Sequence, residues 1–282
     1  MNNSKFFLFL VIPLTLVVVS SCDVSKGQAT SYDYKSCSLE LKKILTGKLE
    51  KAESLCAPIP FTLKKKSFGY SVRGKQSQGH FDIRLNGNPI NVFLQAPHVW
   101  SDTDTGSILK KLSKKINPRV SFKNSVHRNY LPLDKKNKGV NFDLGKRKNS
   151  ILVLLSKIFV KDYPYGSVIQ IHGFENSKRK TIKGRNADLI ISSGSFSPSK
   201  RAKTLTRCLK DGHRGLQVYT FPTEVTELGG TKNVLSKLST AKNKSPFIHI
   251  EMSKKYRNLL LSNKEIFGYF SKCIKELSNA QE

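Results

Sequence analysis

The sequence predicts an α/β fold: a single domain with a mostly parallel, mixed sheet flanked by helices. From His98 onward, strand-like and helix-like patterns alternate, and strands that are joined through helices usually pair in parallel. The expected strands are short apolar runs such as SVIQIH and PFIHIE. Once an N-terminal leader is removed, about 220 residues remain, which is enough for one large core.

The expected elements follow one another along the second half of the chain. The predicted helices span residues 105–116, 149–162, 198–210 and 263–278, and the predicted strands span 118–123, 167–172, 187–192, 216–221 and 246–251. Upstream, FGYSVR and HFDIRLNGNPINVFLQA have strand patterns, and the Asn-Gly-Asn at 86–88 marks a tight turn. The segments 134–149, 176–186 and 230–245 are expected to be loops.

The N-terminus has the pattern of an export signal. Residues 1–21 combine a short basic start, an apolar run of 14 residues (FFLFLVIPLTLVVV) and small residues before Cys22. That run is shorter than the roughly 20 residues of a membrane span. Val-Ser-Ser-Cys resembles a bacterial lipobox, so we expect a lipid on Cys22 and a membrane-anchored lipoprotein facing the periplasm or the cell surface. The alternative is an ordinary secretory signal with Cys22 in a disulfide.

The cysteine count agrees with lipidation of Cys22. The chain has five cysteines, at positions 22, 37, 56, 208 and 273. Without Cys22 an even number remains, as expected for disulfides in an exported chain. We expect the pairs Cys37–Cys56 and Cys208–Cys273, one of three connectivities, and the spacing excludes a zinc ribbon. Residues 22–60 would then form a tether with a small cysteine-stapled helical segment, and 61–282 the α/β domain.

The charge balance predicts an acidic partner. Lysine and arginine number 49 against 20 acidic residues, a formal net charge of +29. An acidic peptide-like or polyanionic substrate would be attracted by such a protein. The lysines are scattered and no nucleic-acid-binding motif is present, so nucleic acid is not an expected partner. A generally basic proteome would give the same charge without a functional meaning.

Polar residues follow the strand that ends at Pro97. His98 comes at once, Asp102 four positions later, and Asp104 just before a helical stretch. The carboxyl ends of parallel strands are where α/β proteins place their sites. The alternative is a strand–turn–helix connection in which the aspartates only cap the helix.

Two later strands also carry ionisable residues. His172 ends the strand 167–172, and His249 and Glu251 lie two apart, hence on one face, in PFIHIEM. An ionisable group inside an apolar strand is costly to bury without a partner. A metal ion or a substrate would supply that partner.

Zinc chemistry suits these residue types. A catalytic zinc takes three protein ligands, typically two histidines and a carboxylate, and a separate glutamate moves the proton. His98, Asp102 and His172, followed by Glu251, supply ligands and base in that order. Two alternatives stay open: Asp104 could replace Asp102, or His172, Glu175 and His249 could form the site.

Four motifs in this order resemble a known group of enzymes. They are LQAPHVWSDTDTG at 94–106, IHGFE at 171–175, ELGGTKNV at 227–234 and IHIEMSKKYR at 248–257. Together they look like the zinc amidohydrolases of the N-formylglutamate amidohydrolase and poly-γ-glutamate hydrolase type. The resemblance covers roughly residues 90–260 and implies a carboxypeptidase-like fold.

The resemblance also implies roles for further residues. Arg257 follows the glutamate as the arginine of those families does, and would bind the substrate. Arg128, in NSVHRNYLPLD, would hold a substrate carboxylate, since guanidinium binds carboxylate bidentately. His249 replaces an expected glutamine and would contact substrate or an oxyanion. The aspartate ligand departs from a glutamate that is common there, and residues 23–90 have no counterpart.

The sequence therefore predicts an exported, zinc-dependent amidohydrolase that cleaves an amide bond next to a carboxylate. Its substrate would be a γ-glutamyl polymer, a wall peptide or an N-acylated amino acid. The alternative is a non-catalytic lipoprotein of the same fold that binds an anionic polymer.

Overall fold

The computed structural model describes residues 34–48, 54–55, 61–74, 79–124, 127–129, 143–212, 215–239 and 245–278. The leader, Cys22 and most of the expected tether lie outside these ranges. In the described part of the chain, no helix combines the length and the apolar character needed to cross a membrane.

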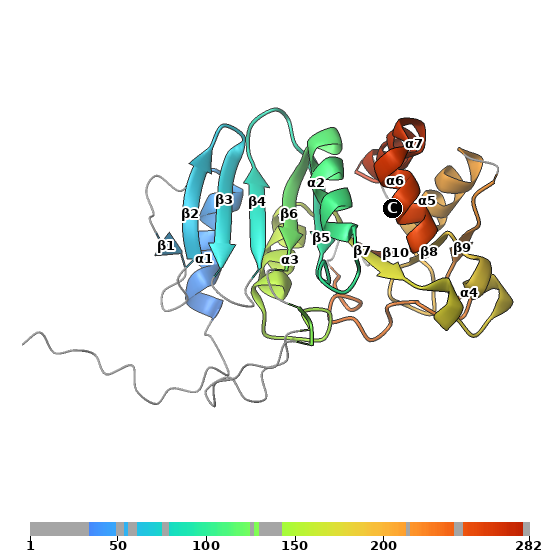
Figure 1. Cartoon of the computed structure of the whole chain (residues 1–282). Helices are drawn as coiled ribbons and strands as arrows, with labels where there is room; N and C mark the ends of the chain where they lie inside the picture. The colour runs from blue at the N-terminus through green and yellow to red at the C-terminus, as the bar shows by residue number, and fades with distance from the viewer. Residues whose placement is uncertain are drawn as a thin grey trace, which may run out of the picture.

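One sheet runs through the whole molecule (Figure 1). Its strands lie in the order β1-β2-β3-β4-β6-β5-β7-β10-β8-β9. In chain order they are β1 (Ser54–Leu55), β2 (Phe61–Lys66), β3 (Gly69–Gly74), β4 (His80–Arg84), β5 (Ile90–Ala96), β6 (Pro118–Lys123), β7 (Ser167–Phe174), β8 (Leu189–Ser192), β9 (Val218–Thr220) and β10 (Phe247–Ser253). The single α/β domain with a mixed sheet is therefore confirmed.

Parallel pairing is concentrated in the middle of the sheet. Strands β6, β5, β7 and β10 are parallel neighbours, and β8–β9 at one edge is also parallel. The pairings β1–β2, β2–β3, β3–β4, β4–β6 and β10–β8 are antiparallel. The sheet is thus less parallel than expected, because the β pattern before residue 90 builds an antiparallel half.

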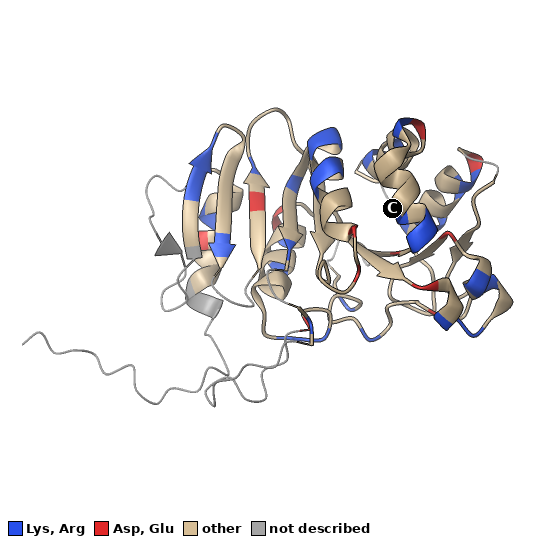
Figure 2. Cartoon of the chain, viewed as in Figure 1, with Lys and Arg blue, Asp and Glu red and all other residues tan. Residues whose placement is uncertain are grey.

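Helices cover both faces of this sheet. They are α1 (Tyr34–Leu45), α2 (Thr105–Ile116), α3 (Ile151–Asp162), α4 (Ile182–Asn186), α5 (Lys200–Asp211), α6 (Lys254–Ser262) and α7 (Lys264–Glu276). Helices α1 and α3 share one apolar cluster with Phe93 and Phe247, whereas α2, α5, α6 and α7 share another with Leu94 and Ile248. Neighbouring strand residues point to opposite faces, so each central strand contributes to both cores. Lysine and arginine are spread over strands and helices alike (Figure 2).

The expected tight turn at 86–88 exists, but the strands beside it do not pair. Gly87 and Asn88 have left-handed φ values of 73° and 51°. Strand β6 nevertheless lies between β4 and β5. Strand β5 is apolar almost throughout and buried toward its end, as in central parallel strands, so it pairs with parallel neighbours on both sides.

The C-terminal helical region consists of two helices instead of the expected one. Asn263 ends α6, and its side chain accepts hydrogen bonds from the backbone N–H groups of Glu265 and Ile266 at the start of α7. Such an N-cap makes a new helix begin. The first of these helices, α6, was not expected.

The cysteines and the N-terminal segment join the main core. Cys208 on α5 and Cys273 on α7 form a disulfide with a Cα–Cα distance of 5.8 Å, which confirms that predicted pair. Cys37 is disulfide-bonded, and its expected partner Cys56 lies outside the described residues. Leu41 and Ile44 of α1 are fully buried against the α3 side of the sheet, so this segment is part of the domain.

Candidate metal and hydrolase site

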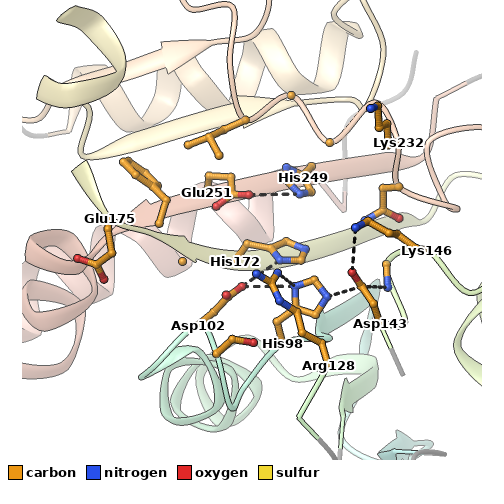
Figure 3. Close-up of a pocket in the computed structure, with 18 of the residues that line it drawn as sticks. His98, Asp102, Arg128, Asp143, Lys146, His172, Glu175, Lys232, His249 and Glu251 are labelled. Atoms are coloured by element: carbon orange, nitrogen blue, oxygen red, sulfur yellow. Dashed lines mark hydrogen bonds and ion pairs between the residues drawn. The ribbon is translucent and has the colours of Figure 1, made fainter. Parts of the chain in front are cut away.

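The polar residues of three central strands meet at the carboxyl ends of these strands (Figure 3). His98 lies just beyond β5, His172 lies in β7, and His249 and Glu251 lie in β10. Glu251 is the direct neighbour of His172 across the parallel β7–β10 ladder. The carboxyl ends of adjacent parallel strands therefore bring together side chains that are up to 153 positions apart (98 to 251).

His98, Asp102 and His172 converge on one point. The Asp102 Oδ2 atom lies 3.1 Å from His172 Nδ1 and 3.6 Å from His98 Nδ1. The two imidazole rings are 4.8 Å apart between centroids. All three side chains are buried, and one ligand atom from each lies within 4.8 Å of the others. This group could hold a metal ion.

The turn after β5 explains why Asp102 and not Asp104 joins this group. The Asp102 backbone N–H donates to the His98 carbonyl at 2.8 Å, and Thr105 Oγ1 donates to the Asp102 carbonyl at 2.6 Å. These bonds fold Asp102 back toward His98. Asp104 stands before α2 with a left-handed φ of 71° and belongs to neither potential metal group of the described residues.

The outer nitrogen of His98 is held by an aspartate that the sequence did not single out. His98 Nε2 lies 2.8 Å from Asp143 Oδ1, which also accepts the Gly145 N–H. On the inner side, Arg128 Nη1 lies 3.3 Å from His98 Nδ1. A guanidinium can only donate, so Nδ1 accepts and Nε2 carries the proton that it donates to Asp143. The Nδ1 lone pair is thus directed at Arg128, and the Asp102 carboxylate lies beside it at 3.6 Å.

The buried histidines and carboxylates shift one another's pKa. Burial opposes ionisation of Asp102, but hydrogen bonds with His172 and His98 outweigh it and hold the pKa of Asp102 well below its usual range. Burial favours a neutral His98, yet Asp102 and Asp143 outweigh it and raise the pKa of His98. Burial lowers the pKa of His172. Asp102 is thus a carboxylate at neutral pH.

His249 and Glu251 form the opposite wall of the site. His249 Nε2 lies 3.7 Å from Glu251 Oε1, and the His249 ring is 4.6 Å from that of His172. Burial, followed by the charge of Asp102, raises the pKa of Glu251 to about 8, and burial lowers the pKa of His249 well below its usual range. With His172, these two residues make a second group of potential ligands.

Arg257 was expected to bind substrate, and Glu175 was an alternative metal ligand. In the structure both make contacts within the protein. Arg257 is buried, and its Nη1 donates to the Met252 carbonyl at 2.6 Å and to the Phe174 carbonyl at 3.4 Å. The guanidinium thus ties the end of β10 to the end of β7. Glu175 is about half exposed, lies 3.6 Å from Arg257 Nη2, and belongs to neither potential metal group of the described residues.

The site opens into a pocket of about 630 Å³. His98, Asp102, His172, His249 and Glu251 line its interior, and its other charged lining residues are mostly basic: Arg128, Lys146, Lys178, Arg179, Lys232 and Arg257, against Asp143 and Glu175. A pocket of this size takes a small molecule or part of a chain. Its lining favours an anionic occupant.

The donor set fits a catalytic zinc ion. Two imidazole nitrogens and one carboxylate are a typical set of three protein ligands, and the pocket leaves a further side open. Both histidines have an oxygen acceptor at the outer nitrogen, Asp143 for His98 and Gln170 for His172, which orients metal-binding imidazoles.

Comparison with known proteins identified similar folds only among solved structures. No family model and no curated protein matches the sequence. A bacteriophage poly-gamma-glutamate hydrolase is 11% identical, with 73% of this chain and 90% of that chain covered and a TM-score of 0.43. N-formylglutamate amidohydrolase from Ralstonia eutropha JMP134 is 11% identical, with 72% and 96% covered and a TM-score of 0.43. A metallo-carboxypeptidase from Burkholderia cenocepacia is 13% identical, with 78% and 65% covered and a TM-score of 0.42.

These structures include both types of amidohydrolase that the four sequence motifs resemble. At this level of similarity the function has to be inferred from the residues of the site itself.

Proposed function

We propose that this protein is a zinc-dependent hydrolase that cleaves an amide bond next to a carboxylate. The convergence of His98 Nδ1, Asp102 Oδ2 and His172 Nδ1 beside Glu251, at the floor of a basic pocket, carries this proposal. Zinc bound by the three residues would act as a Lewis acid toward the amide carbonyl and lower the pKa of a water molecule.

Glu251 is the carboxylate best placed to move the proton. Asp102 is engaged by both histidines, and Asp143 by His98 and Lys146. Among the described residues, Glu251 has a longer contact, 3.7 Å from its Oε1 to His249 Nε2. In its ionised form this carboxyl group, whose pKa burial raises to about 8, would accept a proton from the attacking water and then donate it to the leaving amine. The neutral ring of His249 behind it keeps a second charge out of the site.

Arg128 supports recognition of an acidic substrate. Its guanidinium is half-buried beside His98, at the border between the donor set and the pocket. From there it can donate two parallel hydrogen bonds to a substrate carboxylate. Lys146, Arg179 and Lys232 add positive charge around the same pocket.

The metal ligands can be tested with a matched pair of neighbouring aspartates. We expect the wild-type protein to bind one zinc ion and Asp102→Ala to bind zinc at least about 100-fold more weakly, since a ligand is lost. Asp104→Ala, two residues away, should keep wild-type affinity. Calorimetric titration of zinc into chelator-treated protein measures both. Equal affinity of Asp102→Ala and Asp104→Ala would refute the assigned ligand set, and no zinc binding by wild type would favour the non-catalytic alternative.

The role of Glu251 is tested by Glu251→Gln, which keeps the shape of the side chain but cannot accept the proton. Turnover of a γ-glutamyl or N-acyl glutamate substrate should fall by about 10²-fold or more. Zinc content and melting temperature should stay near the wild-type values, and both are measured on the same preparation. Wild-type turnover in a folded, zinc-loaded Glu251→Gln protein would contradict this role.

We also propose that the protein is exported and held on a membrane by a lipid on Cys22, because residues 1–22 have the lipobox pattern. In bacterial cells that express Cys22→Ala, the protein should move from the membrane fraction to the soluble fraction, since multiple acyl chains give stable anchoring. Ser21→Ala, which keeps the cysteine, is the control. A membrane fraction of Cys22→Ala equal to that of wild type would exclude a lipid anchor at this residue.

A further inference from the structure

A second cavity continues from the pocket along the surface. It measures about 760 Å³ and shares Lys146, Thr231, Lys232 and Asn233 with the catalytic pocket. From there it runs between α3 and the segment 231–239. In Figure 3, Lys146 and Lys232 lie at the end of the pocket away from Glu175, which is the side where the groove begins.

The groove is basic along its length. Five lysines line it, at positions 146, 148, 157, 232 and 237, and none of its described lining residues is acidic. Lys146 is paired with Asp143 at 3.6 Å. Between the lysines the lining includes the apolar side chains Val153, Leu235 and Leu238. A ligand with repeated negative charges on an apolar backbone would match both features.

We propose that this groove binds the continuation of a carboxylate-bearing chain whose amide bond lies in the catalytic pocket. The catalytic pocket alone already has the volume of a typical small-molecule site, about 300–1,000 Å³. An N-acylated amino acid would therefore leave the groove empty, whereas a polymer of acidic residues would extend from Arg128 past Lys146 toward Lys157. The position of the amide bond rests on the proposed function, but binding of the chain does not require hydrolysis.

The groove is tested by binding of a fluorescein-labelled poly-L-glutamate oligomer to the metal-free, full-length protein. In the triple variant Lys148→Gln/Lys157→Gln/Lys237→Gln, the dissociation constant from fluorescence anisotropy should rise about tenfold, the summed effect of three exposed charge pairs. The control variant Lys64→Gln/Lys110→Gln/Lys203→Gln changes the net charge equally at exposed positions outside the groove. It should bind like wild type.

An equal loss of affinity in both triple variants would show that net charge alone attracts the oligomer, and it would overturn the proposed binding in the groove. So would a loss confined to inorganic polyphosphate, measured as a second probe, because the lysines would then recognise phosphate. Hydrolysis of a short substrate and zinc affinity are measured separately. A failed binding test therefore leaves the proposed chemistry standing, and a failed Glu251 test leaves the groove standing.

A second observation concerns two glutamines that are fully buried side by side. Gln95 of β5 and Gln170 of β7 are neighbours in the parallel ladder. Gln170 Nε2 donates to Gln95 Oε1 at 2.8 Å, and Gln95 Nε2 donates to Ser156 Oγ at 2.9 Å. Ser156 Oγ in turn donates to the Leu152 carbonyl at 2.7 Å. At the other end, Gln170 Oε1 lies 3.2 Å from His172 Nε2.

The three hydrogen bonds between Leu152 and Gln170 have forced directions. The Leu152 carbonyl can only accept, so Ser156 donates its one hydroxyl proton to it and must accept from the amide of Gln95. The oxygen of Gln95 then faces Gln170 and accepts from its NH₂ group. The oxygen of Gln170 faces His172, so a His172 ring that binds a cation through Nδ1 would donate from Nε2 to this oxygen.

Asn233 fixes Gln170 independently from the pocket side. Its Oδ1 accepts the Leu235 N–H at 3.0 Å, so its Nδ2 is the atom that donates to Gln170 Oε1 at 2.7 Å. We infer that Gln170 is a positioning residue: by accepting from His172 Nε2 it favours the tautomer that frees Nδ1, otherwise a donor to Asp102, to bind a cation. This inference rests on the proposed metal site, and the proton position on the zinc-bound ring is observable separately from activity.

The test uses Gln170→Met, which has a similar length but no amide oxygen. In zinc-loaded protein, the ¹⁵N shifts of the His172 ring should show a single Nε2–H tautomer in wild type and a mixture in Gln170→Met. Zinc affinity should fall about 10- to 100-fold, the usual effect of losing an outer hydrogen bond to a ligand. Gln170→Glu, which keeps the acceptor, should retain both properties. If Gln170→Met does not fold, Gln95→Met should show the same shift more weakly.

Thr206→Val is the control, because it removes a buried hydrogen bond between α5 and β9 at a distance in the fold from the site. It should lower stability without changing the tautomer. An unchanged tautomer and zinc affinity in folded Gln170→Met would overturn the inference. Equal losses of zinc affinity in Gln170→Met and Thr206→Val would overturn it too, since they would show a general effect of stability.

Discussion

The parallel pairing of β5, β7 and β10 is the constraint on which the rest of the site depends. Each of these strands is apolar enough to be buried on both faces, and each carries an ionisable residue near its end or, in β5, is followed by one, His98. Because parallel neighbours end at the same edge, burial of the apolar parts forces the ionisable parts together. The surrounding polar contacts are the consequence, since none of these groups could remain buried without partners.

The same constraint separates the chemical roles of the carboxylates. Asp102 sits between two histidines and stays ionised, whereas Glu251 is buried beside the neutral ring of His249 and its pKa is raised. Asp143 is more exposed, and hydrogen bonds from His98 and Gly145 lower its pKa to about 2 despite partial burial. The three acids of the pocket thus have three different environments. These suit Asp102 as a ligand, Glu251 as the group that moves a proton, and Asp143 as the hydrogen-bond acceptor that holds His98.

Much of the fold could be predicted because periodic patterns report burial. Helix α2 and strand β6 begin and end within one residue of the predicted bounds, since each has a clear amphipathic or apolar period between turn residues. The order of strands in the sheet could not be read in the same way. Strand β6 inserts between β4 and β5, and this pairing depends on contacts between segments that are distant in sequence.

The candidate site was predictable where the chemistry lies at strand ends, and less so where it lies in loops. His98, Asp102, His172 and Glu251 are together in space, as the strand pattern indicated. Asp143 was missed because it lies in a basic, polar segment without a period. Gln170 could have been noticed in the sequence, because it is an amide within the apolar run SVIQIH. A buried amide requires hydrogen-bond partners, so its position predicts a polar contact inside the sheet.

The ELGGTKNV segment, residues 227–234, is one loop that contacts several parts of the site. Glu227 accepts the Thr181 N–H at 3.0 Å and its hydroxyl at 2.7 Å, which fixes the start of the segment to α4. Gly230 has a left-handed φ of 61°, and a Cβ there would lie 2.9 Å from the ring of His249. A side chain at this position would therefore push the loop off the histidine.

Three residues further on, Asn233 reaches Gln170 and thereby the hydrogen-bond chain behind His172. The segment thus contacts the wall formed by His249 and the support of His172 at once, and its next residues line the lysine groove. A change in the position of this loop would move a wall of the pocket, the tautomer support of one potential ligand and the entrance of the groove together. The glycine contacts His249 of β10 and the asparagine contacts Gln170 of β7, although both lie in one short loop. Because the loop couples these contacts, there is a physical reason for the glycines and the asparagine to occur together in one motif.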